Sequence, residues 1–154
     1  MSRRIEITMS KDELGRFLEE ERVVTCATIG PNGRPHLMPL WYVVDDGVIT
    51  AWTFGKSQKA RNLERLPQAS LQIQAGDTYQ ELRGVMFECD VEIVRDLPAV
   101  LRIGTAVMMR YAPGATADDV RPNVERQAPK RVAYRFHPTR TVTWDHRKLG
   151  RGVY

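Results

Sequence analysis

The sequence predicts a mainly β protein, a closed or partly closed β-barrel with two or three peripheral helices in a single domain over residues 1–154. Short apolar, β-branched segments recur between tight-turn signals, as in strands that form meanders. The predicted helices are too few to cover both faces of an open sheet. The chain contains no internal repeat or linker-like stretch, so one core is expected.

The first half of the chain predicts one helix and three antiparallel strands. Ser10 and Glu13 form a capping-box pattern that begins a helix over about 11–21. Strands are expected at 23–29, 35–44 and 48–54, with turns at 30–33 and 45–47. Pro39 indicates a bulge or a sheet edge in the second strand, because proline cannot donate to a β-ladder.

The second half predicts more strands, interrupted by helices. Ser57 begins a helix that continues to about Leu66 and is ended by Pro67. A second helix is expected after Asp96, and one short helix within 113–129. Strands are expected at 69–75, 84–94, 131–136 and 139–144.

Composition excludes several classes of protein. No apolar run reaches the ~18 residues of a membrane span, and the N-terminus lacks the apolar region of a secretory signal. Cys26 and Cys89 are isolated within apolar segments, which is typical of buried free thiols in a reducing compartment, and we expect a cytoplasmic protein. His36, His137 and His146 lack ligand spacing, so no metal site is expected.

The net charge of +4 and a basic C-terminal segment from Lys130 onward suit an anionic partner. The chain has no RNP-type aromatic motif, zinc-finger spacing or helix-turn-helix, so no nucleic-acid partner is expected.

The stretch from Thr53 onward predicts an anion site. A strand ends, Gly55 permits a sharp turn, and a serine-capped helix starts immediately. The unpaired N–H groups at a helix start attract anions, and Lys56 and Lys59 flank this one within a turn. The alternative interpretation is a capped surface helix with solvated lysines.

Two segments carry a family resemblance. Residues 27–47 (ATIGPNGRPHLMPLWYVVDDG) and 56–73 (KSQKARNLERLPQASLQI) resemble the pyridoxamine 5′-phosphate oxidase-like, FMN-binding split barrel superfamily. More narrowly, they resemble its branch that uses coenzyme F420, and the ending TWDHRKLG at 143–150 is similar to endings in that branch. The resemblance extends over residues 10–150.

The resemblance implies a split β-barrel that forms a homodimer, with two cofactor sites at the subunit interface. It implies that the cofactor phosphate meets the start of the 57–66 helix and that the ring lies along the second and third strands. Tyr79 is expected to come from the partner subunit. The implied cofactor-binding residues are Met38, Pro39, Leu40, Thr53, Lys56, Ser57, Lys59, Asn62 and Tyr79.

The function implied is that of an F420-dependent reductase, which transfers a hydride from reduced deazaflavin to an electron-poor small molecule. Two alternatives stay open: an FMN-dependent flavoprotein of the same fold, and a non-catalytic F420 carrier. No catalytic side chain is assigned, because the cofactor supplies the reactive atom. The proton is expected from solvent or from a nearby group such as Tyr42. The basic C-terminal segment is compatible with the acidic tail of F420.

Overall fold

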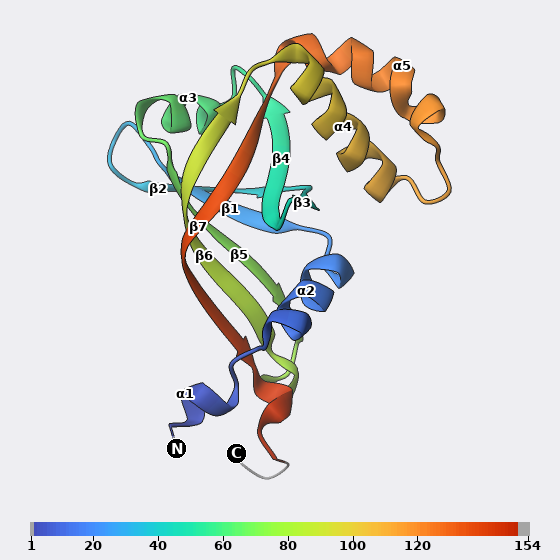
Figure 1. The fold of residues 1–154 in the computed structure, drawn as a ribbon. Coiled ribbons are helices and arrows are strands. Elements are labelled where there is room, and N and C mark those ends of the chain that lie inside the picture. The colour runs from blue at the N-terminus through green and yellow to red at the C-terminus, as the bar shows by residue number, and fades with distance from the viewer. Residues whose placement is uncertain (1, 151–154) are drawn as a thin grey trace.

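The computed structural model describes residues 2–150, and these form a mainly β half-barrel with flanking helices, as in a split β-barrel (Figure 1). The strands form one antiparallel sheet in the order β2-β1-β5-β6-β7-β4-β3. They are β1 (Val24–Ile29), β2 (Pro35–Leu40), β3 (Val43–Asp45), β4 (Val48–Phe54), β5 (Gln68–Ala75), β6 (Arg83–Val94) and β7 (Arg131–Asp145).

Helices flank the curled sheet (Figure 1). The α-helices are α1 (Arg3–Glu6), α2 (Lys11–Glu20), α3 (Gln58–Arg65), α4 (Leu97–Tyr111) and α5 (Ala117–Gln127). Short 3-10 turns are η1 (Tyr79–Glu81), η2 (Ala128–Lys130) and η3 (His146–Lys148).

The predicted helix starts are confirmed. The Glu13 amide donates to Ser10 Oγ over 3.2 Å, and the Ser10 amide donates to Glu13 Oε2 over 2.6 Å, which completes the capping box. Ser57 Oγ accepts from the Ala60 amide at 3.2 Å and caps α3. Each cap satisfies one of the N–H groups that a helix start leaves unpaired.

The predicted continuous strand at 35–44 is wrong, because the chain turns after Leu40. β2 pairs with β1 at one edge of the sheet, whereas β3 pairs with β4 at the other edge. The crossing is held at Tyr42, which is fully buried and donates its hydroxyl to the Leu18 carbonyl over 2.7 Å. Pro39 does lie on an edge strand, as predicted.

Two expectations for the C-terminal part are also corrected. The region 113–129 contains the 11-residue α5, with Pro122 inside it, followed by η2. The two closing strands are one strand, β7, because the predicted break near Pro138 is only a register shift against β6 between Glu88 and Cys89. A bulge of this kind admits an extra residue without ending the strand.

Apolar side chains form two packed clusters. The first lies within the curled sheet and against α2 and α3, and includes Phe17, Leu40 and Leu63. The second lies between α4, α5 and the outer part of the sheet, and includes Trp52 and Val107. A cleft opens where these clusters meet, since Leu40 and Trp52 both line it.

Candidate functional site

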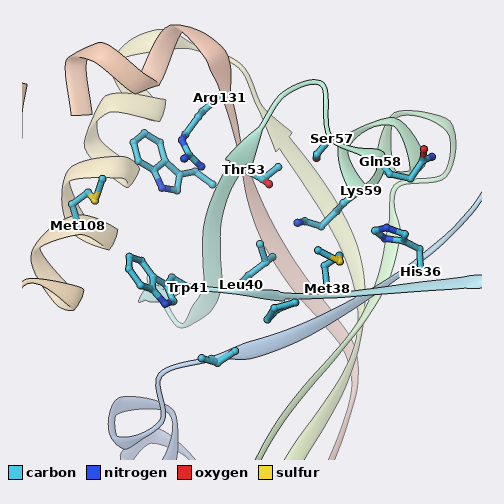
Figure 2. A pocket seen from close by; sticks show the side chains of 13 residues that line it. His36, Met38, Leu40, Trp41, Thr53, Ser57, Gln58, Lys59, Met108 and Arg131 are labelled. Atoms are coloured by element: carbon cyan, nitrogen blue, oxygen red, sulfur yellow. The ribbon is translucent and has the colours of Figure 1, made fainter. Parts of the chain in front are cut away.

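The cleft has a volume of about 720 Å³, within the range of small-molecule sites. β2 and β4 supply opposite walls, and α3, α4 and β7 add side chains to them (Figure 2). Its lining residues are Val23, His36, Met38, Pro39, Leu40, Trp41, Trp52, Thr53, Ser57, Gln58, Lys59, Met108 and Arg131.

Local structure explains how side chains from separate segments meet here. Alternate residues of a strand share one face, so His36, Met38 and Leu40 of β2 face the cleft together. Across from them β4 contributes Thr53 just before the chain turns. The Gly55 amide donates to the Lys130 carbonyl over 2.9 Å and anchors that turn, so α3 begins at the cleft wall.

Lys59 is the most informative residue of the cleft. Its side chain is 5% exposed, and it forms no hydrogen bond or ion pair with any other residue between 2 and 150. Figure 2 shows the amine pointing between the β2 and β4 walls. A buried ammonium without a partner is costly, because water is removed and nothing replaces it. This arrangement is understandable if an anion binds in the cleft.

The surroundings of Lys59 disfavour the charged form of its amine. Burial lowers the pKa of its ammonium group; the positive Arg131 guanidinium acts in the same direction, and only the Cys26 thiol opposes them. Burial also raises the pKa of Cys26 to about 11, so that thiol is neutral and gives Lys59 no counter-charge at physiological pH. None of the described cleft-lining residues is acidic. The cleft therefore carries a net positive charge.

The cleft has a polar end and an apolar end. At the polar end Ser57, Gln58 and His36 surround Lys59 (Figure 2). His36 Nδ1 is buried and has no hydrogen-bond partner among residues 2–150. After the Lys59 amine, it is the second polar atom at this end that a ligand or water can satisfy. Ser57 Oγ accepts the capping bond, which leaves its hydroxyl hydrogen to donate.

The apolar end is aromatic. Trp41 and Met108 lie on the side of the cleft away from Ser57 and His36 (Figure 2). Trp52 joins them, and the Arg131 guanidinium lies over its ring at 4.6 Å from the centroid. Arg131 Nε also donates to Gln127 Oε1 over 2.9 Å, which orients the guanidinium.

A second hollow of about 630 Å³ shares Arg131 with the cleft. Lys56, Arg95 and Lys130 line it with Arg131, and no acidic residue does so in the described part of the chain. Arg95 forms an ion pair with Glu64 at 2.7 Å, so the positive charge of this hollow comes mainly from the other three cations. The second hollow therefore extends the positive charge beyond the cleft.

Six of the predicted cofactor-binding residues line the cleft together: Met38, Pro39, Leu40, Thr53, Ser57 and Lys59. The other three lie elsewhere in the chain. Lys56 is exposed and lines the second hollow. Asn62 is fully buried, donates to Thr28 Oγ1 over 3.0 Å and accepts from Gln58 Nε2 over 2.8 Å, so it holds α3 against β1.

Tyr79 lies in η1, where its ring packs on His146 at 4.4 Å between centroids. It does not line the cleft of its own chain, so its expected role across a subunit interface stays a prediction. His146 Nδ1 lies 2.9 Å from the Tyr79 carbonyl oxygen, a structural hydrogen bond.

Tyr42 is a poor proton source, contrary to the sequence-based expectation. It is fully buried, does not line the cleft, and donates its hydroxyl to the Leu18 carbonyl. Burial raises its pKa to about 12, although Arg110 opposes this.

Sequence reasoning missed Arg131, Trp41 and Trp52 as cleft residues. Arg131 reaches the site because β7 pairs with β4, which places it opposite Phe54 in the register. No local signal carries that information. The helix-capping pattern at Ser57 marked only the α3 side of the cleft.

The basic C-terminal segment is largely neutralised within the chain. Arg140 pairs with Glu88 at 3.2 Å, and Lys148 with Glu13 at 2.6 Å. Arg147 pairs with the buried Asp145 at 2.6 Å and keeps the pKa of that carboxyl low. Among the basic residues of this segment that the structure describes, Lys130 and Arg131 line the second hollow.

Residues 2–150 form neither a metal site nor a membrane-spanning helix. They contain no cluster of three or more His, Cys, Asp or Glu side chains that could hold a metal ion. None of their helices is long and apolar enough to cross a membrane.

Residues 10–145 match the protein family described as pyridoxamine 5′-phosphate oxidase. The chain belongs to the pyridoxamine 5′-phosphate oxidase family. A conserved hypothetical protein of this fold, Rv2991 from Mycobacterium tuberculosis, is 48% identical, with 96% of this chain and 91% of that chain covered and a TM-score of 0.89. The predicted family and split-barrel fold are therefore confirmed. None of the curated proteins matches the chain.

More distant members of the fold bind different groups. A structure described as an F420 reductase has a TM-score of 0.63 and 24% identity, with 82% of this chain and 93% of that chain covered. HutZ, described as a heme storage protein from Vibrio cholerae, has a TM-score of 0.68 and 18% identity, with 86% and 94% covered. At these identities the likeness concerns the fold, so the cofactor must be inferred from this chain's own site.

Proposed function

We propose that this member of the pyridoxamine 5′-phosphate oxidase family binds coenzyme F420 in the cleft and is an F420-dependent reductase. The observation that carries the proposal is the buried Lys59 ammonium, which lacks a counter-ion at the start of α3. When bound, reduced F420 supplies a hydride from C5, and the substrate also takes a proton, so that two electrons reduce a carbon–carbon double bond or carbonyl.

The cofactor phosphate is assigned to the polar end. The Lys59 ammonium, the Ser57 hydroxyl and the first amides of α3 converge there and suit phosphate oxygens. An anion would satisfy the charge that burial leaves unsolvated. The ring is assigned to the space between Met38, Leu40 and Thr53, where both walls are strands and their positions are rigid.

The second hollow favours F420 over FMN. The tail of F420 carries several carboxylates beyond its phosphodiester, whereas FMN ends at its phosphate. Lys56, Lys130 and Arg131 lie in a hollow that adjoins the cleft through Arg131 and has no acidic lining residue in the described chain. We assign the carboxylates to this hollow, which gives the exposed Lys56 a role that differs from that of Lys59.

Parallel titrations with F420 and FMN test this assignment. Lys59→Ala should weaken both by about 1.5–3 kcal/mol, since each loses a hydrogen bond to a charged group. Lys56→Ala should weaken F420 more than FMN. Lys11→Ala, an exposed lysine outside the cleft and the second hollow, is the matched charge control and should change neither. Unchanged affinity in the Lys56→Ala/Lys59→Ala double variant would refute the phosphate site.

The same titrations separate the alternatives. Tight FMN binding with little F420 binding would make the protein an FMN-dependent flavoprotein. Tight F420 binding without turnover on a panel of enones and quinones would make it an F420 carrier. The two free, buried cysteines agree with the cytoplasmic location proposed for either role.

The homodimer is proposed from the outer face of β2. Pro35 and Leu37 of this edge strand are exposed, Leu37 by 57%, and Ile29 of the neighbouring β1, which pairs with Pro35, is exposed as well. An apolar edge is usually covered in a native protein. Light scattering should give twice the chain mass, and Leu37→Glu should lower it to the monomer value. A monomeric wild-type protein would contradict this proposal.

A further inference from the structure

We propose that Asn123 and Gln127 of α5 are positioning residues, which hold the Arg131 guanidinium so that its outer edge faces a carboxylate of the ligand. The inference rests on the proposed function, because the carboxylates are those that F420 carries in its tail. It goes beyond that function by assigning the orientation of Arg131 to two side chains that line neither the cleft nor the second hollow.

Arg131 is the cation that the cleft and the second hollow share. Its Nε donates to Gln127 Oε1 over 2.9 Å, whereas its two Nη atoms form no hydrogen bond or ion pair with residues 2–150. Figure 2 shows the side chain extending from β7 toward the cleft. Burial lowers the pKa of this guanidinium, which still remains protonated. The edge formed by Nη1 and Nη2 is therefore free to bind a carboxylate through two parallel hydrogen bonds.

Two contacts fix the plane of this guanidinium. One face lies over the Trp52 ring, 4.6 Å from the centroid, which limits tilting. Rotation within the plane is limited by the hydrogen bond from Nε to Gln127. Gln127 is the last residue of α5 and Arg131 is the first of β7, so this bond spans the η2 connection. The orientation of Arg131 therefore depends on the end of α5.

The chain of hydrogen bonds behind Arg131 has one consistent direction. An arginine N–H can only donate, so Gln127 must present its amide oxygen to Arg131. The amide nitrogen of Gln127 then donates to Asn123 Oδ1 over 2.8 Å. Arg126 Nη2 donates to the same oxygen over 2.6 Å, so Asn123 cannot reverse its amide without losing both bonds. A cation at each end therefore selects one orientation for both amides.

This relay should favour F420 over FMN. A long side chain that is held in advance loses less conformational entropy when it binds. Its free edge matches the two oxygens of a carboxylate, and several carboxylates are present in the F420 tail. FMN lacks that tail, and its phosphate is assigned to the polar end of the cleft. The relay should therefore change F420 affinity and leave FMN affinity nearly unchanged.

The Nε–H signal of Arg131 in a proton–nitrogen correlation spectrum tests the relay without a ligand. It is assigned by its absence in Arg131→Met, which keeps an apolar stem over Trp52. A hydrogen-bonded N–H exchanges slowly with water, and in Gln127→Leu the exchange should be at least about tenfold faster. Gln72→Leu is the matched control, because it removes the bond between exposed Gln72 and Gln74 outside both cavities, and should leave the signal unchanged.

Titrations with F420, FMN and the peptide tri-γ-glutamate, which has the chemistry of the tail, test the effect on binding. Gln127→Leu should weaken F420 roughly three- to tenfold and FMN by less than about twofold. Asn123→Ala should weaken F420 by about twofold, because Gln127 keeps its bond to Arg131 and loses only its own support. A positioning residue acts through Arg131, so Gln127→Leu should cause no further loss in the Arg131→Met protein. The peptide should show the same dependence on Gln127.

The outcomes separate this inference from the proposed function. Slow exchange that persists in Gln127→Leu, or equal F420 affinity in that variant and the wild type, would overturn the relay and leave the F420 site intact. A further loss in the Arg131→Met background, or equal weakening of FMN, would indicate a general structural role and also overturn it. Peptide binding that depends on Gln127 in a protein that does not bind F420 would support the relay and refute the cofactor. A wild type that binds neither would overturn both.

Discussion

Gly104 of α4 lies against the indole of Trp52 so closely that a Cβ at position 104 would come within 2.4 Å of Cζ3. Trp52 in turn lines the cleft, under the Arg131 guanidinium. The glycine therefore sets how far α4 can approach β4, and through Trp52 it shapes the cleft wall.

We expect Gly104→Ala to destabilise the protein by about 1–3 kcal/mol through overpacking, even though alanine favours the helix. The indole must move, and because it lines the cleft, ligand affinity should fall as well. Urea unfolding and F420 titration measure the two effects.

Gly84→Ala is the control for this prediction. A Cβ there would come within 2.4 Å of the Trp144 ring and 2.7 Å of the Ile73 carbonyl, so similar overpacking is expected. Gly84 does not line the cleft, and the folded variant should keep its ligand affinity. Equal loss of affinity in both variants would contradict the role of Gly104.

Lys59→Met should stabilise the unliganded protein while it weakens anion binding. Because burial lowers the pKa of Lys59 in the folded state, the unfolded chain holds this proton more tightly. The penalty is present at neutral pH and is relieved as the pH rises from the lowered folded pKa to the ordinary lysine value. A gain of about 0.5–2 kcal/mol is expected in urea unfolding at neutral pH, and a loss of stability would contradict it.

Anion affinity should depend on pH through the same residue. Only protonated Lys59 attracts an anion, so F420 affinity should fall as the pH rises through the lowered pKa. The fall should begin at a lower pH than an exposed lysine would produce. Fluorescence titrations from about pH 7 to pH 10 measure it, and Lys59→Ala should flatten this part of the profile. A wild-type profile with no fall over that range would refute the assignment.

Cys26 and Cys89 should be inert in the folded protein. Both are buried, and burial raises the pKa of Cys26 to about 11 and that of Cys89 to about 12, so little thiolate exists at neutral pH. A thiol-reactive chromogenic disulfide should label neither until the protein unfolds, when both should react. Rapid labelling of the native protein would show that this part of the sheet opens.

Arg110→Met should destabilise the protein by about 1–3 kcal/mol. The Arg110 guanidinium donates to the carbonyl oxygens of Leu18, Glu19, Glu21 and Tyr42, and these lose their partner together. Arg121→Met removes only an exposed ion pair with Asp118 and should change stability by less than about 1 kcal/mol. Equal unfolding midpoints for the two variants would contradict the anchoring role of Arg110.

Local patterns in the sequence determined most of the elements. Capping by Ser10 and Ser57, apolar periodicity in α4 and the alternation along β5 depend on neighbours a few residues away, so the chain itself displays them. The sequence likewise marked Lys59 as a candidate anion ligand, through its position within the first turn of a capped helix.

Only the tertiary structure decided which candidates form the site. It divided the apolar run 35–44 between opposite edges of the sheet, brought Arg131 beside β4, and separated Lys56 and Asn62 from the cleft. It also buried Lys59 without a partner, which is the feature that points to an anion. Strand pairing joins residues distant in the chain, and burial depends on every element packed around a side chain. Neither can therefore be predicted from the local sequence.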